Sequence, residues 1–67
     1  MSGSSLGKRL RHLRTSLGKS LEQVAANVGS TKGHLSKVER DVAAPSIALL
    51  TRLASEYGVP PGEIVNA

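Results

Sequence analysis

The sequence contains no cysteine, tryptophan or phenylalanine, and tyrosine occurs once, at Tyr57. Without cysteine, neither a disulfide framework nor a thiolate metal site can form. A single aromatic side chain also disfavours the binding modes that stack nucleobases on aromatic platforms, which single-strand binders and many RNA binders use.

Long apolar runs are absent too, since the longest, residues 47–50, is far too short to cross a bilayer. The N-terminus shows no charged-then-apolar signal peptide, so we expect a cytoplasmic protein. Five acidic residues stand against nine Lys and Arg, which gives a formal net charge of +4. A basic balance favours anionic partners, duplex DNA above all, although many small domains are basic for solubility alone.

A length of 67 residues allows one domain with a thin core, which often gains stability from dimerisation. Residues 1–4 are small and polar, and we expect a disordered N-terminal tail there. Residues 5–67 are then the folded domain.

Apolar residues recur at helical spacing along the chain, and no segment alternates as a strand would. The first helix is predicted over residues 6–17. The second is predicted to begin at Ser20, which forms a capping box with Gln23, and to end at Gly29, which supplies the positive φ of a sharp turn.

Thr31 is a suitable cap for a third helix that runs to about Arg40. After a loop, Ser46 caps a fourth helix that runs to Tyr57, and residues 60–61, both proline, open a short fifth helix. The sequence therefore predicts an all-α fold, a compact five-helix domain.

The second and third helices carry the functional information, because two capped helices joined by a short glycine-led turn can place the second of them in a DNA major groove. On a helical wheel, Leu35 and Val38 of the third helix share one side. The opposite side holds cations, one hydroxyl, one glycine and no carboxylate; its residues are Lys32, Gly33, Ser36, Lys37 and Arg40. This distribution favours DNA recognition over a merely solvated basic face.

The ordered set of residues in this region resembles the phage repressor and Cro-type helix-turn-helix family of bacterial regulators. The resemblance extends from Leu6 to Ile64 and is carried by Ala25, Gly29, Leu35, Ser36, Val38-Glu39-Arg40 and Pro45-Ser46. It implies a repressor-like domain that binds a partly palindromic DNA operator as a homodimer and regulates transcription, more often as a repressor than as an activator.

The resemblance also implies roles for single residues. The positions that face bases are Lys32, Gly33, Ser36 and Lys37, and those that contact phosphates are Ser20, Thr31, His34 and Arg40. Arg14 and Glu39 match a partly buried ion pair, although the wheel alone leaves Arg9 as an alternative to Arg14. His34 is equally well explained as an ordinary surface histidine.

Two departures from the family pattern favour a second function class, a protein-interaction module of the same fold, such as an antitoxin-like or partner-binding domain. Gly33 has no side chain with which to contact a base, and the loop over residues 42–44 is uncharged where relatives often add basic residues.

We expect dimer contacts around Tyr57, Val59 and Ile64. No histidines and acids share metal-ligand spacing, and no nucleophile lies in a recognisable catalytic setting. We therefore expect no metal, no cofactor and no enzymatic activity.

Overall fold

The computed structural model describes residues 5–65, which form five α-helices and no strand. They are α1 (Leu6–Ser16), α2 (Leu21–Val28), α3 (Lys32–Glu39), α4 (Ile47–Tyr57) and α5 (Pro61–Val65). The prediction of a compact all-α, five-helix fold is confirmed. The expected tail over residues 1–4, and the last two residues of the expected domain, lie outside the described residues.

The first four helices each begin at a hydroxyl cap. In every case the cap oxygen accepts a hydrogen bond from the backbone N–H three residues on, which satisfies one of the donors that a helix start leaves free. The caps are Ser5, Ser20, Thr31 and Ser46. These local bonds explain why the helices begin where they do.

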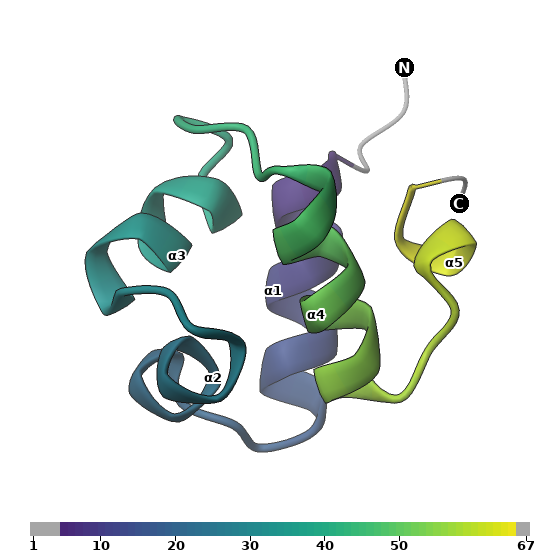
Figure 1. Cartoon of the computed structure of the whole chain (residues 1–67), viewed down its shortest axis with the longest axis horizontal. Coiled ribbons are helices and arrows are strands. Elements are labelled where there is room, and N and C mark those ends of the chain that lie inside the picture. Colours follow the sequence, from purple (N-terminus) through teal and green to yellow (C-terminus); the bar gives the residue numbers. More distant parts are fainter. Residues whose placement is uncertain (1–4, 66–67) are drawn as a thin grey trace.

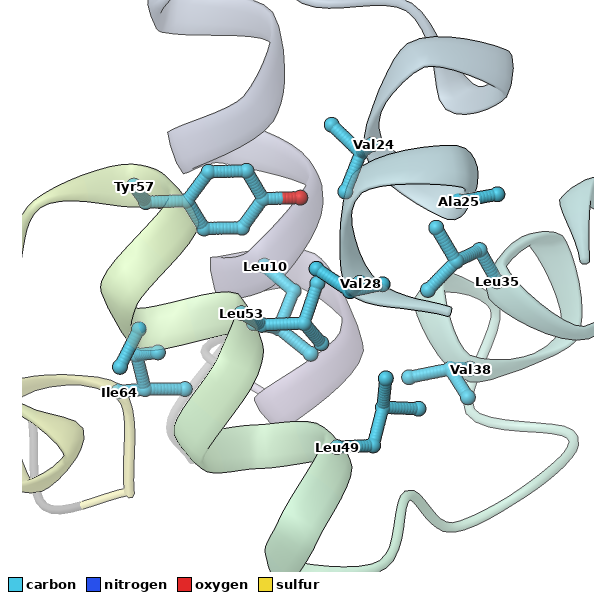
Figure 2. Close-up of a cluster of buried hydrophobic side chains, with 11 residues drawn as sticks. Leu10, Val24, Ala25, Val28, Leu35, Val38, Leu49, Leu53, Tyr57 and Ile64 are labelled. Carbon is cyan, nitrogen blue, oxygen red and sulfur yellow. The ribbon is translucent and has the colours of Figure 1, made fainter. Parts of the chain in front are cut away.

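The core lies between all five helices (Figure 2). Its buried side chains are Leu10, Val24, Ala25, Val28, Leu35, Val38, Leu49, Leu53, Ala54, Tyr57 and Ile64. Every helix contributes at least one of them, so no helix could be removed without exposing apolar surface to water. In Figure 1, α1 and α4 occupy the middle, with α2 and α3 on one side and α5 on the other.

Residues distant in sequence hold α1 in place at its N-terminal end. The backbone N–H of Gly7 donates to the Asp41 carboxylate at 3.0 Å. Asp41 adopts a left-handed backbone conformation, with φ at 60°. The hydroxyl of Ser5, and then the Gly7 N–H, lower the pKa of Asp41 below its usual value of 3.8. The loop after α3 therefore fastens the start of α1.

Gly7 is needed for the close approach of α1 to the end of α3. A Cβ atom there would lie 2.6 Å from the carbonyl oxygens of Val38 and Glu39. On the opposite flank of α1, the Arg9 guanidinium donates to the carbonyl oxygen of Ile64 at 2.6 Å and so ties α5 to α1. The packing of α1 thus fixes the orientation of α3, the helix that carries most of the predicted site.

Candidate nucleic-acid interface

The turn between α2 and α3 is built by short-range hydrogen bonds. Ser20 and Gln23 form the full capping box at the start of α2. Gly29 closes α2 in the left-handed region, with φ at 71°, and its N–H donates to the carbonyl oxygen of Ala25. The N–H of Ser30 donates to the same oxygen at 2.9 Å. These bonds fix the conformation of the turn that leads from α2 into α3.

The inner side of α3 is fixed by two aliphatic residues. Leu35 and Val38 are each 1% exposed and face the core that α1, α2 and α4 complete (Figure 2). Because both side chains are buried in the core, α3 has one defined rotation about its own axis.

The outer side of α3 is open to solvent. In Figure 1 this helix lies at the edge of the molecule opposite α5. Lys32, Gly33, Lys37 and Arg40 are exposed, and Ser36 is half-buried. The five positions that the wheel placed outward therefore do share a surface that a partner can reach.

Two contacts modify the charge of this outer surface. The Lys32 ammonium lies 3.8 Å from the carboxylate of Glu22, which α2 supplies, so an acid stands beside the cationic face even though α3 offers none there. At the other end, Nε of Arg40 donates to the carbonyl and hydroxyl oxygens of Ser36, each at 3.3 Å. Both contacts are exposed and weak, so the side chains can exchange them for a partner's groups.

The three remaining positions assigned to phosphate contact surround the start of the two helices. Ser20 and Thr31 are exposed, and each hydroxyl accepts its cap bond with a lone pair. Since a hydroxyl can donate while it accepts, both remain able to donate to a phosphate oxygen. His34 is half-buried, one turn into α3.

Arg14 and Glu39 form a bidentate ion pair between α1 and the last residue of α3. The two hydrogen bonds are 2.7 and 3.0 Å long, and Arg14 also donates to the carbonyl oxygen of Lys19 at 2.9 Å. The hydrogen bond to Glu39 is the main reason why the pKa of Arg14 is raised above its usual value. This guanidinium thus links α1, the turn before α2, and α3.

The residues assigned to dimer contact lie mostly inside the protomer. Tyr57 is 5% and Ile64 1% exposed, because both complete the core, while Val59 is half-buried. Burial raises the pKa of the Tyr57 phenol to about 12. Tyr57 and Ile64 therefore offer almost no surface to a second copy, and Val59 offers some.

One polar cluster has no counterpart in the sequence interpretation. The Glu56 carboxylate of α4 accepts hydrogen bonds from Asn27 of α2 at 2.8 Å and from Lys19 at 3.2 Å. The bond from Asn27 is the largest cause of a lowered pKa for Glu56. This cluster holds α2, and the segment that precedes it, against α4. No spacing rule links residues so far apart in sequence.

Other classes of site find no support in the part of the chain described. Within residues 5–65, no three His, Asp or Glu side chains are grouped so that they could hold a metal ion. None of the helices in that range has the length and apolar character that crossing a membrane requires.

Comparison with known proteins gave a match over most of the chain. The model of the helix-turn-helix family matches residues 10–64. No curated protein sequence matches.

Several solved structures are similar to the chain. The restriction-modification controller protein C.AhdI from Aeromonas hydrophila is 34% identical, with a TM-score of 0.84, over 88% of this chain and 89% of C.AhdI. The N-terminal DNA binding domain of SinR from Bacillus subtilis is 28% identical, with a TM-score of 0.86, over 92% of this chain and 91% of that domain. SinR, described as the master regulator for biofilm formation, was also solved in complex with DNA. That match covers 92% of this chain and 100% of the SinR chain, again at 28% identity and a TM-score of 0.86. In the complex of SinR with SinI, the match covers 61% of the other chain.

Proposed function

The chain belongs to the phage repressor and Cro-type helix-turn-helix family, and on that premise we propose that it represses transcription by binding a pseudo-palindromic operator as a homodimer. As a member of this family it is a DNA-binding transcriptional regulator and not an enzyme. The observation that carries the proposal is the solvent-exposed outer side of α3, with Lys32 and Lys37 facing away from Leu35 and Val38.

In the proposed complex, α3 lies in the major groove. Lys32 and Lys37 donate to the O6 and N7 atoms of guanine, and Ser36 donates to or accepts from a base edge. Gly33 faces the same groove. Phosphates on either side are contacted by Ser20, Thr31, His34 and Arg40, which position the helix without reading sequence.

Two copies are needed because one short helix specifies only a few base pairs, and useful specificity requires two half-sites about one helical turn apart. We place the dimer contact at the end of α4 and at α5, around Val59, with Tyr57 and Ile64 supporting that surface from inside. Because α5 lies at the edge opposite α3 (Figure 1), such a contact leaves both recognition helices uncovered. Residues 5–67 act as the DNA-binding domain, in the cytoplasm where bacterial DNA is found.

The test begins with duplexes selected from a random pool by the wild-type protein. On the selected duplex, fluorescence anisotropy should show an affinity that falls steeply with salt. Lys37→Ala should lower that affinity by about 5- to 150-fold and relax the preference at one or two base pairs. Lys8→Ala is the matched control, because it removes an exposed lysine from α1 and should leave the base preference as it is.

Retention of both affinity and base preference by Lys37→Ala would refute its assignment. The dimer is tested separately by inserting about five base pairs, half a helical turn, between the half-sites, which should abolish tight binding. Tight binding that survives this insertion would contradict a rigid homodimer. A reporter downstream of the selected site, silenced by the wild type but not by Lys37→Ala, distinguishes a repressor from an activator.

The competing function is a partner-binding module that has kept the fold without DNA binding. It is favoured by the loop over residues 41–46, where Val42 is 64% exposed and no cation is available for a phosphate. Such a module should bind heparin and random duplex weakly even at low salt. Strong, salt-sensitive duplex binding excludes it.

A further inference from the structure

Four glycines of the chain have an internal explanation. Gly7 allows α1 to contact the carbonyl oxygens at the end of α3, where a Cβ would lie 2.6 Å from backbone atoms. The other three end or follow helices in the left-handed region that side chains disfavour; they are Gly18, Gly29 and Gly58.

Gly33 has no such explanation. It lies inside α3, outside the left-handed region, and a Cβ atom built on it meets nothing within 4 Å. Glycine is also the least favourable residue in a helix apart from proline, so any small side chain would make α3 more stable. The fold therefore gives no reason for glycine at this position, and an exposed site on the outer side of α3 directs attention to what that side contacts.

The place of Gly33 on α3 indicates which partner. Ser36 and Lys37 follow it by three and four residues and so flank it on the helix surface. Gly33 thus forms a gap in the middle of the outer side, between side chains that can form hydrogen bonds. A gap there brings the helix backbone itself closest to whatever the outer side contacts.

We propose, on the basis of the proposed function, that Gly33 is a specificity-determining residue that lets α3 approach the DNA closely and accommodates the C5-methyl group of a thymine. The surface that glycine offers at the gap is its Cα with two hydrogens, which is apolar. The C5-methyl of thymine is the apolar group that base pairs present in the major groove. Lys32, Ser36 and Lys37 then contact the polar edges of the neighbouring base pairs.

The experiment adds a methyl group to the protein and removes one from the DNA. Three proteins are titrated against a duplex selected by the wild type: the wild type, Gly33→Ala and the control Ser55→Thr. The control adds a methyl at an exposed position of α4. In a second series of duplexes, each thymine is replaced in turn by deoxyuridine, which lacks the methyl, at the matching position of both half-sites. Thermal unfolding by circular dichroism checks that Gly33→Ala is folded.

Gly33→Ala should be at least as thermally stable as the wild type, yet bind the thymine duplex about tenfold or more weakly. Replacement of one particular thymine in each half-site by deoxyuridine should restore most of that loss for Gly33→Ala. Ser55→Thr should bind like the wild type. Unchanged affinity in Gly33→Ala, or a loss that no deoxyuridine restores, overturns the proposal. If the wild type itself selects no duplex, the proposed function fails first, so the two failures can be told apart.

Discussion

Removing one member of the Arg14–Glu39 ion pair should destabilise the protein more than removing both members. Arg14→Met keeps an apolar stem but leaves the Glu39 carboxylate, whose side chain is 6% exposed, without its two guanidinium bonds. Breaking a buried pair in this way costs about 3–5 kcal/mol. Since the Arg14 side chain is 12% exposed and water can reach the gap, we expect the lower end, about 3 kcal/mol.

That loss is large for a chain of 67 residues, whose total stability is on the order of 3–10 kcal/mol. It should lower Tm by roughly 12–24 °C. The double variant Arg14→Met, Glu39→Leu removes both charges together, so no buried charge remains unpaired. We expect it to lose only about 1 kcal/mol, mainly for the bond from Arg14 to the carbonyl oxygen of Lys19.

The measurement is thermal and urea unfolding, followed by far-ultraviolet circular dichroism, of the wild type, both single variants and the double variant. If Arg14→Met is too unstable to fold, a folded double variant still supports the reasoning. A double variant that loses the sum of the two single losses would refute it, because additivity would mean that the residues stabilise the fold independently.

Three further outcomes are expected. The pKa of Asp41 is lowered, mainly by the Ser5 hydroxyl, so the contribution of Asp41 to stability is present above pH 3.8 and is lost as the pH falls below that value. Asp41→Asn should therefore reduce the fall of Tm with decreasing pH in this acidic range. An unchanged fall of Tm would contradict this. The pKa of Tyr57 is raised to about 12 by burial, so stability should fall as the pH rises from 10 towards 12. Because the sequence has one tyrosine and no tryptophan, phenolate absorbance reports the titration of Tyr57 directly. Titration near pH 10 in the folded protein would disprove the burial. Glu22→Gln removes the carboxylate beside Lys32 and should raise affinity for random duplex by about two- to fivefold at low salt; equal affinities would place Glu22 away from the DNA.

The helices and the outer face of α3 could be predicted from the sequence because both depend on local rules. Hydroxyl caps, glycine stops and 3.6-residue periodicity act within a few residues. The wheel of α3 needed only Leu35 and Val38 to orient the helix. The same rules predicted the exposure of Lys32 and Lys37, since they lie opposite that pair.

The contacts that hold the helices to one another could not be predicted in this way. Asp41 bonds to Gly7 across 34 positions, Arg9 to Ile64 across 55, and Lys19 to Glu56 across 37. Nothing in the segment around Asp41, Lys19 or Glu56 indicates which distant residue its side chain will contact. Glu22 shows the same limit at the site, because its approach to Lys32 depends on the angle between two helices and not on the pattern of either.

Stability and specificity are carried by different residues of α3. Leu35, Val38 and Glu39 hold the helix from inside. On the outer side, Gly33 has open space around its Cα and the side chain of Lys37 is exposed to solvent. Outer residues can therefore change with little effect on stability, and the fold leaves them free to follow the DNA. This separation explains why the sequence predicts the helix-turn-helix readily but not the operator. The operator depends on side chains, and on one missing side chain, whose partners lie outside the protein.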